Sequence, residues 1–95
     1  MMSKVFIEFL STIAFTFFVF SSGNFLVVGA VLALIVYFTK GFALVNPAIA
    51  FAKWMEGAMS TSFMLQIVGA ELLGALVGLQ LYSILYKRRL TFRNF

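Results

Sequence analysis

The chain has 95 residues, of which 63% are hydrophobic and 11% are charged. A soluble domain carries about 25% charged residues because its surface must face water, so this composition predicts a membrane protein. The chain has no cysteine, no histidine and no acidic residue other than glutamate, which excludes disulfides, thiolate metal sites and catalytic triads. We therefore expect no enzyme activity, no cofactor and no metal site. The net charge of +4 does not indicate nucleic-acid binding, because four of the seven basic residues lie together in residues 87–95.

The N-terminal half of the chain is predicted to cross a membrane twice. No charged residue occurs between Glu8 and Lys40. A single helix through that stretch would be about 46 Å long, whereas the hydrocarbon core of a bilayer is about 30 Å thick. The sequence Ser-Ser-Gly-Asn at residues 21–24 is typical of a turn, which gives spans at about 4–20 and 25–42. A signal peptide is the alternative for the first span, and Glu8 within its apolar run argues against it.

A third apolar segment, residues 62–86, is long enough to span a bilayer with some tilt. A basic sequence that begins at Lys87 follows it. We expect the tail, residues 87–95, to lie at the interface, where its charges attract anionic head groups, with disorder as the alternative. The sequence thus predicts a single all-α membrane domain, residues 1–95, with three transmembrane helices.

Residues 41–57, between the second and third spans, contain the only proline. Asn46 is a preferred N-cap residue, Pro47 is a preferred first helical residue, and Gly57 favours a helix end. The predicted helix, at about 47–56, would be about 15 Å long, half the thickness of the hydrocarbon core. We expect a re-entrant half-helix here, and an amphipathic helix on the membrane surface is the alternative.

Polar side chains within the first span form one stripe. Glu8, Thr12 and Thr16 follow one another at intervals of four residues, so they share a helix face that should contact protein and not lipid. Irregular backbone at membrane depth needs hydrogen-bond partners, because lipid offers none. We therefore expect the Glu8 carboxylate to accept hydrogen bonds from the backbone N–H groups that precede the half-helix. This role is a structural clamp; a conduction site is the less favoured alternative.

The third span carries a second stripe, with one polar and three small residues at intervals of four: Gln66, Ala70, Gly74 and Gly78. A stripe of small residues lets two helices approach closely. Glu71 lies beside this stripe and should face the helix bundle, with Lys53 or backbone amides as its partners.

Three short motifs, in order along the chain, resemble the aquaporin family, also called the major intrinsic proteins. Residues 8–12 (Glu-Phe-Leu-Ser-Thr) are similar to the sequence that opens an aquaporin repeat. Residues 46–50 (Asn-Pro-Ala-Ile-Ala) resemble the signature box, and residues 66–70 (Gln-Ile-Val-Gly-Ala) resemble the third helix. The resemblance covers about residues 5–86. It implies one aquaporin-like repeat, with three spans and a re-entrant half-helix.

The resemblance further implies that the start of the half-helix lines a pore, with these candidate residues: Asn46, Pro47, Ala48 and Ile49. A half-helix N-terminus at mid-membrane carries roughly half a positive charge, which repels cations, while the Asn46 amide donates to passing hydroxyl oxygens. The chain departs from the family at Leu44, where a histidine is usual, and at Glu71, which has no counterpart. Ile49 stands where second repeats carry an arginine.

One copy, with three spans and one half-helix, is too small to enclose a pore. The favoured hypothesis is a passive channel for water or small neutral solutes such as glycerol, formed by two or more copies in a cellular or viral membrane. An antiparallel homodimer would recreate the inverted repeats of such channels, and a different chain that supplies the second half is the alternative partner. The second hypothesis is a non-conducting structural membrane protein that keeps the half-aquaporin fold. The third, a permeabilising holin-like protein, leaves the half-helix unexplained.

The basic residues predict an almost unbiased orientation in the membrane. In the predicted topology, three of them lie on the same side of the membrane as the N-terminus: Lys4, Lys40 and Lys53. The other four lie in the tail 87–95, on the opposite side. Because orientation follows the Lys/Arg bias, the chain should insert both ways, and reporter fusions at Phe95 should give signal from both sides. The alternative is that a partner or the insertion machinery fixes one orientation. Signal from one side only, in a preparation that conducts, would exclude the antiparallel homodimer.

Overall fold

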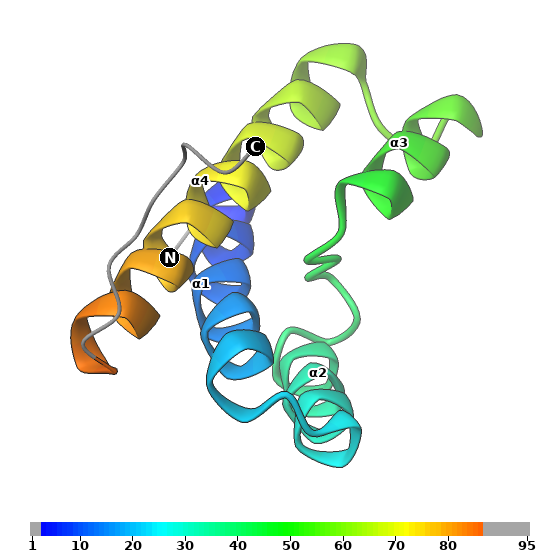
Figure 1. The fold of residues 1–95 in the computed structure, drawn as a ribbon. Coiled ribbons are helices and arrows are strands. Elements are labelled where there is room, and N and C mark those ends of the chain that lie inside the picture. The colour runs from blue at the N-terminus through cyan, green and yellow to red at the C-terminus, as the bar shows by residue number, and fades with distance from the viewer. Residues whose placement is uncertain (1–2, 87–95) are drawn as a thin grey trace.

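The computed structural model describes residues 3–86, which form four α-helices and no strand (Figure 1). Helix α1 (Lys4–Ser22) has 19 residues and helix α4 (Thr61–Leu85) has 25 residues. Helix α2 (Phe25–Phe38) has 14 residues, and helix α3 (Pro47–Met55) has 9 residues. The expected all-α class is confirmed. The tail 87–95, for which an interfacial position was expected, falls outside the described residues.

Each of the four helices begins at a polar side chain that caps its first turn: Ser3, Asn24, Asn46 and Ser60. Asn24 shows the geometry most fully, because its Oδ1 accepts hydrogen bonds from the N–H groups of Leu26 at 2.8 Å and Val27 at 3.2 Å. Such caps bind backbone donors that have no partner within the helix. The sequence signals for helix starts are therefore local, and the starts lie within one residue of those predicted.

The second predicted span, 25–42, is wrong at its C-terminal end, since α2 ends at Phe38. Lys40 and Gly41 take positive φ angles of 56° and 78°, and the Gly41 N–H donates to the Val36 carbonyl at 2.7 Å. These contacts form a Schellman motif, in which N–H groups after the helix donate to carbonyls of its last turn. The chain then turns away from the helix axis. At about 21 Å, α2 is shorter than the roughly 30 Å hydrocarbon core. Among the helices of residues 3–86, only α1 and α4 combine the length and hydropathy of membrane-spanning helices.

The end of α3 follows the expected signal. The N–H of Gly57, whose φ is 86°, donates to the Trp54 carbonyl at 3.0 Å, and the Ala58 N–H donates to the Lys53 carbonyl at 2.9 Å. These two bonds form a second Schellman motif. Only glycine takes this left-handed conformation without strain, so the position of Gly57 decides where the short helix stops.

The fold is organised around a close crossing of α1 and α4, which lie side by side (Figure 1). A Cβ atom placed on Gly74 would lie 2.7 Å from the carbonyl oxygen of Phe9 and 2.9 Å from the Thr12 Cβ. One turn later, a Cβ atom on Gly78 would lie 2.9 Å from the Thr16 Cβ. The two contacts advance in the same direction along both chains, so the helices run parallel. Only glycine permits this approach of the two backbones.

The small-residue stripe does not extend to Gln66, which is exposed and whose amide donates to the Ser62 hydroxyl at 3.3 Å. Gln66 lies before the point where α1 and α4 come closest, so it lacks a neighbour on α1 close enough to bury it. Ala70, Gly74 and Gly78 are all buried. The buried part of the stripe thus begins at Ala70, while Gln66 lines an open groove between α1 and α4.

Large apolar side chains cover much of the outside of the molecule. Helix α2 has no buried residue, and Phe25 on this helix is 81% exposed. Monomeric soluble proteins rarely expose contiguous apolar patches larger than a few hundred Å². The outer surface therefore suits lipid or a protein partner better than water.

The crossing of α1 and α4 can be tested with two equivalent substitutions on one helix. Gly74→Ala should destabilise the fold by about 1–3 kcal/mol, because the added methyl group would collide with the Phe9 carbonyl. Gly69→Ala should be neutral or stabilising by up to about 1 kcal/mol, since nothing lies within 4 Å of its Cβ position and alanine favours helix. Thermal unfolding in detergent micelles measures both. Equal effects of the two variants would contradict the crossing.

Candidate functional site

The candidate site centres on the irregular segment 39–46, which connects α2 to α3 (Figure 1). Ala43 and Val45 in this segment are buried, although the segment has no regular secondary structure. Val45 has a φ of 46°, a conformation that β-branched residues rarely adopt. Such a conformation persists only where the surroundings hold it in place. The contacts that hold this segment come from α1 and α4.

Glu8, on α1, binds the segment through its carboxyl group and is 0% exposed. Its Oε1 accepts hydrogen bonds from the N–H groups of Leu44 at 2.8 Å and Val45 at 2.6 Å. Its Oε2 lies 3.1 Å from the same Leu44 nitrogen. This geometry agrees with the clamp expected from the polar stripe of the first span. Thr12, the next residue of that stripe, is also buried.

Glu71, on α4, binds the next residue along the segment and is 1% exposed. Its Oε2 accepts a hydrogen bond from the Asn46 N–H at 3.0 Å. Of the two kinds of partner expected for Glu71, the structure thus provides a backbone amide, while Lys53 is exposed on α3. Two carboxyl groups from different helices therefore accept hydrogen bonds from three successive backbone N–H groups.

The Asn46 side chain begins α3. Its Oδ1 accepts a hydrogen bond from the Ala48 N–H at 2.9 Å, and Pro47 fills the first helical position, where a backbone N–H would have no partner. Since the cap uses the amide oxygen, the Asn46 side-chain nitrogen is left as a donor. Asn46, Ala48 and Ile49 are exposed, and Pro47 is partly buried.

A hollow of about 310 Å³ lies between α1, α4 and the start of α3. It brings together four of the residues singled out from the sequence: Thr12, Thr16, Pro47 and Glu71. Its remaining wall is mostly apolar and includes Phe15, which sequence reasoning missed. Helical spacing could have found it, because Phe15 lies three residues after Thr12.

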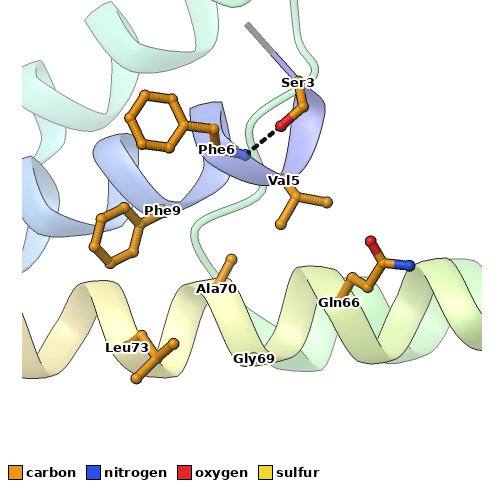
Figure 2. A pocket seen from close by; sticks show the side chains of 8 residues that line it. All are labelled: Ser3, Val5, Phe6, Phe9, Gln66, Gly69, Ala70 and Leu73. Atoms are coloured by element: carbon orange, nitrogen blue, oxygen red, sulfur yellow. Dashed lines mark hydrogen bonds between the residues drawn. The ribbon is translucent and has the colours of Figure 1, made fainter.

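A second hollow, of about 570 Å³, lies between the N-terminal halves of α1 and α4 (Figure 2). Phe6, Phe9 and Leu73 line it, so it is an apolar groove. Its polar members are Ser3, whose hydroxyl is bound to the Phe6 N–H at 3.1 Å, and Gln66. Few polar groups converge here, which makes it a weaker site candidate than the first hollow. Within residues 3–86, no group of three or more potential metal-ligating side chains occurs.

Comparisons with protein-family models, with curated proteins and with solved structures give no match to this chain. Function must therefore be argued from the residues and from their geometry.

The clamp can be tested at the two amides that Glu8 binds. Glu8→Ala should speed hydrogen exchange at the Leu44 and Val45 amides by about 10- to 100-fold, since each loses a hydrogen bond to a buried charged group, worth about 1.5–3 kcal/mol. Glu56→Ala, which removes an exposed carboxylate at the end of α3, should leave both amides unchanged. The two variants are compared by measuring amide hydrogen exchange by NMR in micelles. Unchanged exchange in Glu8→Ala would contradict the clamp.

Proposed function

We propose that the chain is a membrane-embedded subunit of a passive channel for water or small neutral solutes such as glycerol. In this proposal α1, α2 and α4 lie across the bilayer with α3 as a re-entrant half-helix, as in one aquaporin repeat. The exposed apolar surface and the two long apolar helices support the membrane location. At about 13 Å, α3 is too short to cross, so it would enter and leave on one side.

The observation that carries the proposal is the pair of buried carboxyl groups that hold the start of α3. Glu8 and Glu71 bind the three N–H groups that lead into the helix. Non-helical backbone at membrane depth is tolerated where it is buried in protein or lines a water-filled cavity. Here the segment meets the first condition, because it is bound by α1 and α4 and its residues Ala43 and Val45 are buried.

The chemistry at the start of α3 suits neutral solutes. An N-terminal helix end carries roughly half a positive charge and so repels cations. The free amide nitrogen of Asn46 can donate to a hydroxyl or water oxygen. A pore with one such donor and apolar walls passes molecules that hydrogen-bond and refuses ions.

A second copy would complete the pore. The hollow beside α3 is only partly enclosed, and one chain leaves α2 without any buried residue. An antiparallel homodimer would place two α3 starts against each other at the midplane, the arrangement of transporters built from inverted repeats.

A non-conducting structural membrane protein remains the second candidate function. Two residues favour it: Leu44 replaces the family's usual histidine, and Ile49 occupies the position of the arginine in second repeats. Both replacements remove groups that would bind a solute.

Conduction can be tested by stopped-flow shrinkage of vesicles that contain the purified chain. Asn46→Asp should slow shrinkage severalfold, because the new carboxylate keeps the cap but replaces the amide donor with a second acceptor. Asn24→Asp makes the same change at the N-cap of α2, outside the hollow, and should shrink like the unmodified chain. If vesicles with the unmodified chain shrink no faster than empty ones, the protein is not a channel.

Selectivity should differ from that of water-specific relatives. With Ile49 in place of arginine, the narrowest part of the pore should be more apolar. We expect glycerol permeation, relative to water, at least as high as in a typical aquaporin. The measurement is light scattering under a glycerol gradient and under an impermeant osmolyte. Clear water conduction with strict exclusion of glycerol would contradict it.

A further inference from the structure

Two residues that line the hollow beside α3 each have an oxygen atom that is bonded to no N–H or O–H group among residues 3–86. One is the hydroxyl Oγ1 of Thr12, and the other is Oε1 of Glu71. Both residues line the hollow, and both are buried, at 4% and 1% exposed. A buried polar atom without a partner costs about 1–3 kcal/mol, so each requires an explanation.

We propose that Thr12 and Glu71 form a binding subsite for one hydroxyl group of a small neutral solute, in the hollow at the start of α3. The subsite rests on the proposed channel function and names the chemistry that the channel selects. A solute hydroxyl donates its hydrogen to Glu71 Oε1 and accepts one from the Thr12 hydroxyl. The same contact gives both orphan oxygens a partner.

The charges around the hollow exclude anions. The α3 N-terminus contributes about half a positive charge, whereas Glu71 lines the hollow and its carboxyl group lies within hydrogen-bond distance of the Glu8 carboxyl group. An anion would meet two carboxyl groups and only one partial positive charge. The positive end of α3 is also already occupied by acceptors from the protein, the Glu71 carboxyl and the Asn46 side chain.

A metal cation is also a poor fit. Hard cations take about six or more oxygen ligands, and the hollow offers two that are unpartnered. The other oxygens of the two carboxyl groups are engaged by the N–H groups of the segment that leads into α3. A neutral solute that enters the hollow loses one or two hydrogen bonds to water. The Thr12 hydroxyl and Glu71 Oε1 are enough to replace them.

The shape of the hollow favours a solute larger than water. A volume of about 310 Å³ exceeds the roughly 30 Å³ that one water molecule occupies in the liquid. Beside the two polar atoms, the wall presents the apolar side chains of Phe15, Leu72 and Ala75. A polyol has hydroxyl groups and a carbon backbone, so it can face both parts of this wall.

The test is glycerol and water permeation by the full-length chain in phosphatidylcholine vesicles. Thr12→Val keeps the branched shape that packs on Gly74 but removes the hydroxyl, so the ratio of glycerol to water permeability should fall about two- to tenfold, the range of one neutral hydrogen bond. Thr12→Ser should keep the ratio. Ser11→Ala removes a hydroxyl on the neighbouring face, toward α2, and should also keep it.

The outcomes separate this proposal from the channel function itself. An unmodified chain that conducts, with the same ratio in Thr12→Val, would overturn the subsite and leave the channel intact. An unchanged ratio in Glu71→Gln would mean that the Glu8 carboxyl satisfies Glu71 within the protein, which overturns the role of Glu71. A salt current that disappears in either variant would assign the site to a cation instead. No conduction of any solute by the unmodified chain would overturn both proposals.

Discussion

The fold depends on one constraint: backbone N–H groups that are outside a helix and away from water must find acceptors within the protein. Leu44, Val45 and Asn46 lie outside a helix just before α3, and Val45 is buried there. Glu8 and Glu71 supply the acceptors. Without them the start of α3 would carry unpaired donors in the interior, each costing on the order of 1–3 kcal/mol.

The crossing of α1 and α4 makes this clamp possible. Gly74 lies against Thr12, and the two helices run parallel. Glu8 lies four residues before Thr12, and Glu71 lies three residues before Gly74, so both carboxyl groups stand about one turn before the contact. Their shared level lets them bind consecutive residues of one segment. The glycines therefore act on the site indirectly, because they set the distance at which the two glutamates meet.

The same arrangement gives the hollow beside α3 a wall that is polar at Thr12 and Glu71 and mostly apolar elsewhere. In the clamp, both oxygens of Glu8 and one oxygen of Glu71 accept hydrogen bonds from backbone N–H groups. The second oxygen of Glu71 accepts none from an N–H or O–H group in the described chain. Thr12 adds a hydroxyl, and the rest of the wall is largely apolar. The structural requirement for backbone acceptors has thus placed a carboxyl group, that of Glu71, in a residue that lines the hollow.

The sequence by itself determined the features that depend on neighbours along the chain. Side-chain caps and Gly57 fixed the helix starts and the end of α3, since these act through contacts within a few residues. The spacing of Glu8, Thr12 and Thr16 indicated a buried polar face, and the glycine spacing of α4 indicated a close approach. The apolar run itself stops at Phe38, and the predicted end at residue 42 went beyond it because composition does not distinguish one more helical turn from a Schellman turn.

Only the tertiary structure decided which groups meet. Glu8 and Leu44 are 36 residues apart, and Asn46 and Glu71 are 25 apart, so no local pattern pairs them. The sequence left Glu71 with two kinds of partner, and the packing of α4 beside the segment selected the Asn46 amide. The exposure of Gln66 and the unpartnered oxygens of Thr12 and Glu71 likewise follow from where two helices cross. Hydrogen bonds between distant segments depend on the distance and the register between packed helices. The spacing of residues within one helix does not predict either quantity.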